Sequence, residues 1–207
     1  QKGSVDSGTA HTDTLPVERR RGISVKATAA CFDWQGVRVN LIDTPGHVDF
    51  SAEMERTLDV LDCAILAVSG PSGVQSHTYT LWKLLRQRNI PTFLFINKMD
   101  QPGAEKQKIL KDLQKYLGAE ITEFANENFF EEAAVHDERA LEEYLEKGAV
   151  SKEILSDMIG KRRIFPAFFG SALKIQGIEA IMDALSEYMP HKEYPDDFSA
   201  YVYKIGR

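Results

Sequence analysis

Hydrophobic residues recur along the chain with two periods, and each period predicts a different kind of element. Apolar and polar residues alternate over 37–43, as in a strand that buries one side. Residues 25–34 also favour a strand, and the Gln35-Gly36 turn between the two runs predicts a hairpin. Short continuous apolar runs are typical of strands buried on both faces of a parallel sheet, and they occur at 63–68, 92–96 and 164–169.

Leucine and isoleucine spaced three and four residues apart predict helices between these strands. The expected helices are 51–61, 76–88, 102–118 and 178–189. We expect Pro102 to open the third of them, because proline suits the first helical turn. Residues 119–163 are less regular, and we expect two charged helices there, at 137–147 and 151–161, with solvated faces.

Strands that alternate with helices at this spacing predict an α/β fold of three layers around a mainly parallel sheet. In such sheets, ligands lie at the carboxyl ends of the strands, so chemistry is expected after Asp43, Ser69, Asn97 and Gly170. Residues 1–24 show no apolar period and are expected to form a loop.

Composition limits the class of protein. The 207 residues are 43% hydrophobic and 27% charged, which fits one globular domain with a real core. The net charge of −6 argues against a free-standing nucleic-acid clamp, although it allows RNA contact through one small patch. Cys31 and Cys63 lie in apolar stretches and are expected to be buried thiols in a reducing compartment. No apolar run reaches the roughly 18 residues of a membrane span.

The first strand end with candidate chemistry is Asp43-Thr44-Pro45-Gly46-His47. A carboxylate at this position can hold Mg²⁺ through water, because Mg²⁺ keeps most of its hydration shell. The glycine three residues later lets a backbone N–H approach a terminal phosphate. The same residues are also typical of a plain turn.

The second strand end carries Asn97-Lys98-Met99-Asp100. The Asp100 carboxylate can accept hydrogen bonds from the N1–H and the exocyclic amine of guanine, a donor pair that adenine lacks. Asn97 can tie neighbouring loops together, and the stem of Lys98 can cover the purine face. The alternative is a polar turn after a strand.

The third strand end carries Ser171-Ala172-Leu173, where the Ala172 N–H can meet the guanine carbonyl. The tripeptide alone is uninformative. It becomes informative only as the third of three motifs that occur in order, each after a predicted strand.

Together these motifs resemble the G domain of a GTPase, and the resemblance runs from about residue 3 to the end of the chain. Arg21-Gly22-Ile23-Ser24 narrows it to translational GTPases. Gly3-Ser4-Val5-Asp6 and residues 72–78 look most like the tetracycline-resistance ribosomal protection proteins, with elongation factor G as a close relative.

The resemblance implies roles for individual residues. Ser24 and Asp43 would hold Mg²⁺, the Gly46 N–H would bind the γ-phosphate, and His47 would position the hydrolytic water, with the ribosome as activator. Residues 3–24 would be the first switch and 43–55 the second. The guanine nucleotide would contact Asn97, Lys98, Asp100, Ser171, Ala172 and Leu173. Ser24 replaces the usual threonine but keeps the hydroxyl.

One expected motif is missing: the chain contains no Gly-x-x-x-x-Gly-Lys-Ser/Thr phosphate loop. The resemblance therefore implies a G domain over 1–190 that lacks its first strand, phosphate loop and first helix, followed by a linker and the first strand of a β-barrel domain over 191–207. We expect the full-length parent to bind GTP or GDP with Mg²⁺, and these residues alone to bind none and to be inactive. The sheet would then close its gap by direct pairing of strands 37–43 and 62–69, by a neighbour's strand, or by a displaced segment.

The function implied is that of a cytoplasmic, ribosome-associated GTPase that confers tetracycline resistance by ribosomal protection. Its partners would be GTP and the ribosome, with ribosomal RNA near the second switch, and neither a membrane nor DNA. An elongation factor G or release factor type of GTPase is the alternative within the class. An interaction module without catalysis is the alternative outside it.

Overall fold

The computed structural model describes residues 27–45, 51–124, 126–189 and 197, with backbone alone for 51–53. The chain divides into two compact units, Asp62–Glu193 and Gln1–Leu61 together with Tyr194–Arg207. Several predictions fall outside the described residues: the loop over 1–24, the linker over 190–195, the strand over 199–205 and the site residues Ser24, Gly46 and His47.

The first unit contains the predicted hairpin. Strands β1 (Thr28–Trp34) and β2 (Val37–Asp43) pair antiparallel, with Trp34 opposite Val37 and Thr28 opposite Asp43. Gln35 and Gly36 both have positive φ angles, 46° and 81°, as a two-residue type I′ turn requires. Helix α2 (Ser51–Leu58) follows and ends before the predicted Leu61.

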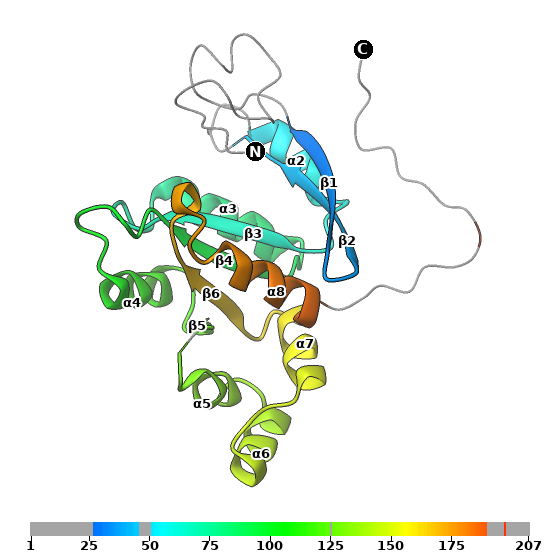
Figure 1. The fold of residues 1–207 in the computed structure, drawn as a ribbon, viewed down its shortest axis with the longest axis vertical. Helices are drawn as coiled ribbons and strands as arrows, with labels where there is room; N and C mark the ends of the chain where they lie inside the picture. The colour runs from blue at the N-terminus through cyan, green and yellow to red at the C-terminus, as the bar shows by residue number, and fades with distance from the viewer. Residues whose placement is uncertain (1–26, 46–50, 125, 190–196, 198–207) are drawn as a thin grey trace. The chain divides into compact units, whose positions relative to one another are not determined.

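The second unit is built on a four-stranded parallel sheet in the order β3-β4-β6-β5 (Figure 1). Its strands are β3 (Ala64–Ser69), β4 (Thr92–Asn97), β5 (Ile121–Glu123) and β6 (Phe165–Phe169). Ser69 pairs with Asn97, and Ile96 pairs with Phe169, so three strands end at the same level. In the first unit, β1 and β2 form a two-stranded sheet of their own.

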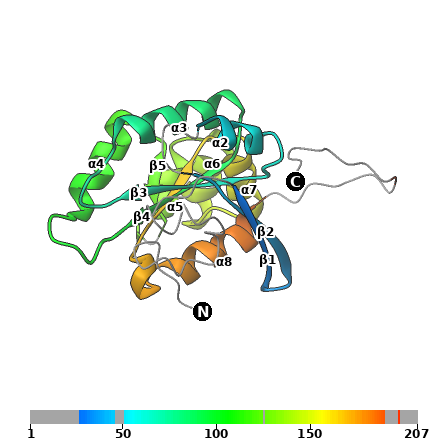
Figure 2. The same cartoon turned by 90° about the horizontal axis from the view of Figure 1, so that it is seen from above.

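Helices cover both faces of this sheet. Figure 2 shows α3 (Ser76–Gln87) and α4 (Lys106–Tyr116) on one face and α8 (Ile178–Tyr188) on the other. Successive side chains of β4 point to opposite faces, and Phe93 and Phe95 join the core cluster that includes Ile181 of α8. The predicted α/β fold of three layers is therefore confirmed.

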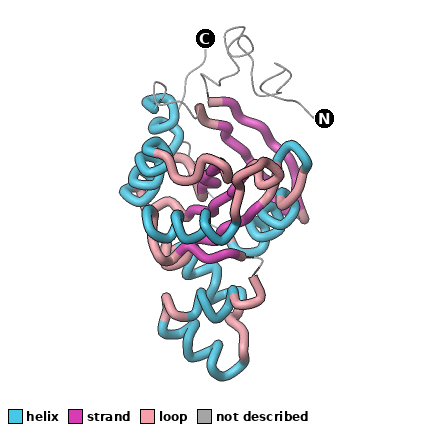
Figure 3. The backbone as a smooth tube through the Cα atoms, turned by 90° about the vertical axis from the view of Figure 1, so that its left-hand side faces the viewer, coloured by secondary structure: helices cyan, strands magenta, loops and turns pink. Residues whose placement is uncertain are grey.

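The region between β5 and β6 holds three helices, α5 (Phe129–Ala134), α6 (Glu138–Lys147) and α7 (Lys152–Gly160). Figure 3 shows them extending beyond one end of the sheet. The charged pattern predicted α6 and α7 within one residue at each end. Strand β5 and helix α5 were not predicted.

Two expectations from the sequence are wrong. Pro102 does not open a helix, because Gly103 has a φ of 86° and α4 begins only at Lys106. Cys31 is exposed, since it lies on a two-stranded hairpin, and its Sγ donates to Asn40 Oδ1 at 2.9 Å; Cys63 is half-buried. None of the described helices has the length and apolar character needed to cross a membrane.

Candidate functional site

The predicted base-recognition residues meet at the carboxyl ends of β4 and β6. Asn97 is the last residue of β4, and its Oδ1 accepts hydrogen bonds from the N–H groups of Lys98 and Ala172, each at 2.8 Å. Lys98 has a φ of 63°, which turns the chain sharply out of the strand. Asn97 thus ties two loops together, the role that its position in the second motif predicted.

This geometry changes the prediction for Ala172. Its N–H is already donated to Asn97, so it is not a free donor for a guanine carbonyl. It would reach such a carbonyl only by sharing its hydrogen between two acceptors, as three-centre hydrogen bonds do.

The Asp100 carboxylate is held beside the third motif. Its Oδ2 lies 3.3 Å from Lys174 Nζ, and its side chain is 19% exposed. A hydrogen bond from the Ser171 side chain, with a further contribution from Lys174, lowers the pKa of Asp100 below its usual value. The carboxylate is therefore ionised at neutral pH and positioned as a hydrogen-bond acceptor.

A short antiparallel bridge between Ser171 and Gln176 fixes the Ser171–Leu173 loop. The Ser171 N–H donates to the Gln176 carbonyl at 3.1 Å, and the Gln176 N–H donates back at 3.0 Å. Between them, residues Ala172–Lys174 form a 3₁₀ turn. Ser171 is buried, whereas Leu173 is 74% exposed and lies on the surface of the loop.

Two glycines permit this close packing. A Cβ on Gly170 would overlap the Gln176 carbonyl oxygen, and Gly177 has a φ of 76° with Phe169 O directly beside it. A third glycine, Gly70, follows β3, donates its N–H to Asn97 O at 2.8 Å and leaves room for Met99. The strand ends are thus joined by backbone hydrogen bonds before any ligand arrives.

Three residues that shape this site were not predicted from the sequence: Lys174, Gln176 and Gly70. Lys174 directly follows the third motif, but its partner Asp100 lies 74 residues earlier, so no local signal pairs the two residues. Gln176 and Gly70 act through backbone geometry, for which the sequence offers only the strand-end glycine as a hint.

Of the residues predicted to bind phosphate and Mg²⁺, the structure describes only Asp43. Asp43 is the half-buried last residue of β2, in the first unit, and Thr44 and Pro45 follow it. Within the described part of the chain, no group of three or more His, Cys, Asp or Glu side chains could hold a metal ion. A single carboxylate at a strand end fits a Mg²⁺ ion bound mostly through water, and does not fit a metal held by protein ligands alone.

The chemistry offered by the second unit is recognition of a planar polar ligand. An ionised carboxylate can accept from two adjacent N–H donors, and the exposed residue Lys98 lies two positions before Asp100 in the sequence. This combination would suit a base with two neighbouring donors on one edge.

Comparison with known proteins agrees with this chemistry. The family described as elongation factor Tu GTP binding domain matches residues 1–191. The chain is 34% identical to "Tetracycline resistance protein TetP" of Clostridium perfringens, over 99% of the chain and 36% of that protein. It is 38% identical to "Tetracycline resistance protein TetW" of Butyrivibrio fibrisolvens, over 90% of the chain and 32% of that protein. The chain therefore spans about a third of the length of these curated relatives.

A solved structure supports the fold. A crystal structure of a Thermus thermophilus protein superposes with a TM-score of 0.81 at 23% identity, over 92% of this chain and 36% of that one. The family match over most of the sequence is consistent with the motifs at the three strand ends. The chain belongs to the elongation factor Tu GTP-binding domain family.

Proposed function

We propose that this chain is the GTP-binding and GTP-hydrolysing domain of a ribosome-associated translation factor that protects the ribosome from tetracycline. The proposed binding of a guanine nucleotide rests on the ionised Asp100 carboxylate, which Ser171 and Lys174 hold just after the end of β4. The ribosomal part rests on the relatives, whose names are those of tetracycline resistance proteins.

In this proposal, Asp100 accepts the N1–H and exocyclic amine of guanine. Asn97 holds the loop that carries Asp100 against residues 171–173, and the Lys98 stem covers one purine face. Ser171 orients the carboxylate, and Leu173, exposed on the loop, covers the other side of the base. Ala172 contributes mainly through its hydrogen bond to Asn97.

The phosphate end of the site is assigned to residues of the two switches. Ser24 and Asp43 would hold Mg²⁺, which would offset the negative charge of the phosphates. The Gly46 N–H would bind the γ-phosphate. His47 would orient the attacking water, and ribosomal RNA near the second switch would bring it into position.

We further propose that residues 1–190 form the G domain, that 191–207 lead into a β-barrel domain, and that the whole protein works in the cytoplasm on ribosomes. Because these 207 residues contain no phosphate-loop motif, we expect them to bind no GTP or GDP and to show no GTPase activity by themselves. Calorimetry with GDP and Mg²⁺ tests this, and micromolar binding would contradict it.

The test of the function uses the whole protein. Purified protein should hydrolyse GTP faster when 70S ribosomes are added, and the full-length gene should let a susceptible host grow on tetracycline. Stimulated hydrolysis without resistance would favour a factor of the elongation or release type. Lack of both would exclude the proposal.

A further inference from the structure

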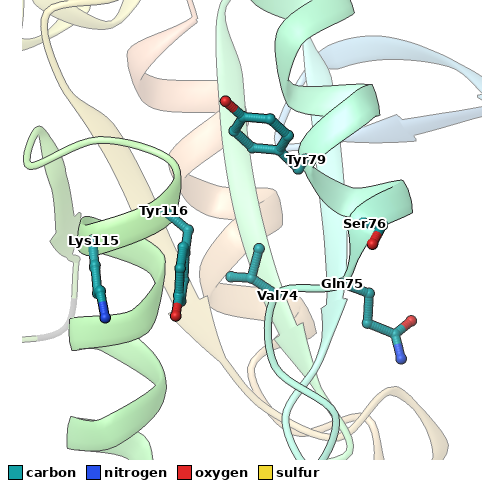
Figure 4. Close-up of a pocket in the computed structure, with 6 residues that line it drawn as sticks. All are labelled: Val74, Gln75, Ser76, Tyr79, Lys115 and Tyr116. Atoms are coloured by element: carbon teal, nitrogen blue, oxygen red, sulfur yellow. The ribbon is translucent and has the colours of Figure 1, made fainter.

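A second candidate site lies on the face formed by α3 and α4, and it shares no residue with the base-recognition loops. A pocket of about 450 Å³ opens there (Figure 4). Its lining residues are Val74, Gln75, Ser76, Tyr79, Lys115 and Tyr116. The volume falls within the range of small-molecule pockets, roughly 300–1,000 Å³.

Two exposed tyrosines dominate this pocket. Tyr79 is 43% exposed and Tyr116 is 51% exposed, although large aromatic rings are usually more deeply buried. Each ring carries a lysine on one side: Lys83 Nζ lies 4.6 Å from the Tyr79 ring centre, and Lys115 Nζ lies 5.1 Å from that of Tyr116. In Figure 4 the Tyr116 ring is seen edge-on, with Lys115 on one side and Val74 on the other. The face of the Tyr116 ring away from Lys115 is thus turned toward Val74, across the pocket that both residues line.

Exposed lysines are frequent on the two helices that carry these rings. Lys108, Lys111 and Lys115 recur at helical spacing and share one exposed face of α4, and Lys83 is exposed on α3. None of them lies within 4.0 Å of a carboxylate oxygen among the described residues. In a protein with a net charge of −6, these four lysines on two adjacent helices form a local basic surface.

We propose that this α3–α4 face binds a single-stranded segment of RNA, with one unstacked base in the pocket. Aromatic faces stack bases of any sequence, and nearby lysines contact the flanking phosphates. Gln75 and Ser76 complete the lining of the pocket at the start of α3, and the Gln75 side chain points away from the two rings (Figure 4). An acidic peptide would form ion pairs with the lysines but would not stack on the two tyrosine rings. The proposal stands whether or not the protein hydrolyses GTP.

The experiment measures anisotropy of a fluorescently labelled single-stranded RNA oligonucleotide over a series of KCl concentrations. Tyr116→Ala should weaken binding about tenfold, the effect of losing one base–aromatic stack, whereas Tyr116→Phe should bind like the wild type. Lys111→Ala and Lys115→Ala should each reduce the slope of log K against log salt by about 0.7.

The matched control is Lys152→Ala, because Lys152 is an exposed lysine on α7, outside this face. It should leave both affinity and salt slope unchanged. Circular dichroism of each variant checks that the fold is retained. Unchanged RNA affinity in a folded Tyr116→Ala variant would overturn the proposal. So would equal competition by a polyglutamate peptide, which would identify an acidic peptide as the ligand class.

Discussion

Asn97 Oδ1 accepts the N–H of Ala172 at 2.8 Å and thereby joins two loops that lie 75 residues apart in the sequence. The same oxygen accepts the Lys98 N–H. One side-chain acceptor thus fixes the turn that leaves β4 and the loop that follows β6. Asp100 and Ser171 lie in these two loops, so their relative position depends on Asn97.

Replacement of Asn97 tests this connection. Asn97→Ala leaves two N–H groups without an acceptor and should lower the free energy of unfolding by about 1–3 kcal/mol. Asn97→Asp keeps the acceptor and should lose less. Urea denaturation of both variants measures the difference, and equal losses would show that the accepted hydrogen bonds are unimportant.

Asp100 should determine the choice of base. In the whole protein, Asp100→Asn replaces an acceptor with an amide donor and should shift preference from GTP toward xanthosine triphosphate. An unpaired polar group costs about 1–3 kcal/mol, so GTP affinity should fall about tenfold or more. Asp112→Asn, on α4, is the matched control and should bind GTP normally. Unchanged GTP affinity in Asp100→Asn would refute the assignment.

His47 is assigned to catalysis alone. In the whole protein, His47→Ala should lower ribosome-stimulated GTP hydrolysis by about 10²-fold or more, the contribution of a positioned acid–base group. GTP binding, measured by fluorescent nucleotide titration, should change little. A variant that turns over like the wild type would remove His47 from the mechanism.

The sequence predicted those parts of the fold whose signals are local. The hairpin over 28–43 follows from alternation and a two-residue turn, and β3, β4 and β6 follow from continuous apolar runs. Strand β5 has three residues and α5 has six, too few for a period to be visible. Their positions depend on tertiary contacts, such as that between the rings of Phe124 and Phe129, whose centres are 4.8 Å apart.

The candidate site divides in the same way. Asn97 and Asp100 were predicted because they belong to one recognisable motif at the end of a strand. Lys174 was missed because its partner, Asp100, is close only in the folded chain. The occupied N–H of Ala172 could not be predicted either, since it depends on how two distant loops meet.

Glu143 should make stability depend on pH. Its carboxylate accepts from the Ser151 N–H at 2.8 Å, from the Ser151 hydroxyl at 2.7 Å and from Lys147 at 2.9 Å. These bonds, led by the backbone N–H, lower the pKa of Glu143 to about 2, against 4.5 for a free glutamate. A depressed carboxyl pKa stabilises the fold above the unfolded pKa, and the contribution is lost as pH falls from 4.5 toward 2.

NMR titration of Glu143 measures that pKa directly, and thermal unfolding across this pH range measures its effect on stability. Glu143→Gln should flatten the pH dependence of the melting temperature, because the neutral amide does not titrate. Glu142→Gln, on the exposed side of the same helix, should leave the dependence as in the wild type. A pKa for Glu143 near 4.5 would contradict the expectation.

Gly170 should be the least replaceable residue of the site. A Cβ there would overlap the carbonyl oxygen of Gln176 and lie 3.1 Å from the Phe95 ring, so Gly170→Ala must displace backbone that closes the Ser171–Gln176 bridge. Forcing atoms into a packed position typically costs about 1–3 kcal/mol. The displaced loop also carries the Ser171 contact to Asp100, so the variant should lose stability and raise the pKa of Asp100 together.

Gly70→Ala is the matched comparison for Gly170→Ala. Its Cβ would meet the flexible end of Met99 at 2.9 Å and the Asn97 carbonyl oxygen at 3.1 Å, whereas a Cβ on Gly170 would overlap backbone, which moves aside less easily than a side-chain end. Urea denaturation should therefore show a larger loss of stability for Gly170→Ala than for Gly70→Ala, and NMR should show the raised pKa of Asp100 only in the former. If the two alanine variants were equally stable and Asp100 titrated as in the wild type, the 170–176 loop would not be held by this close backbone contact.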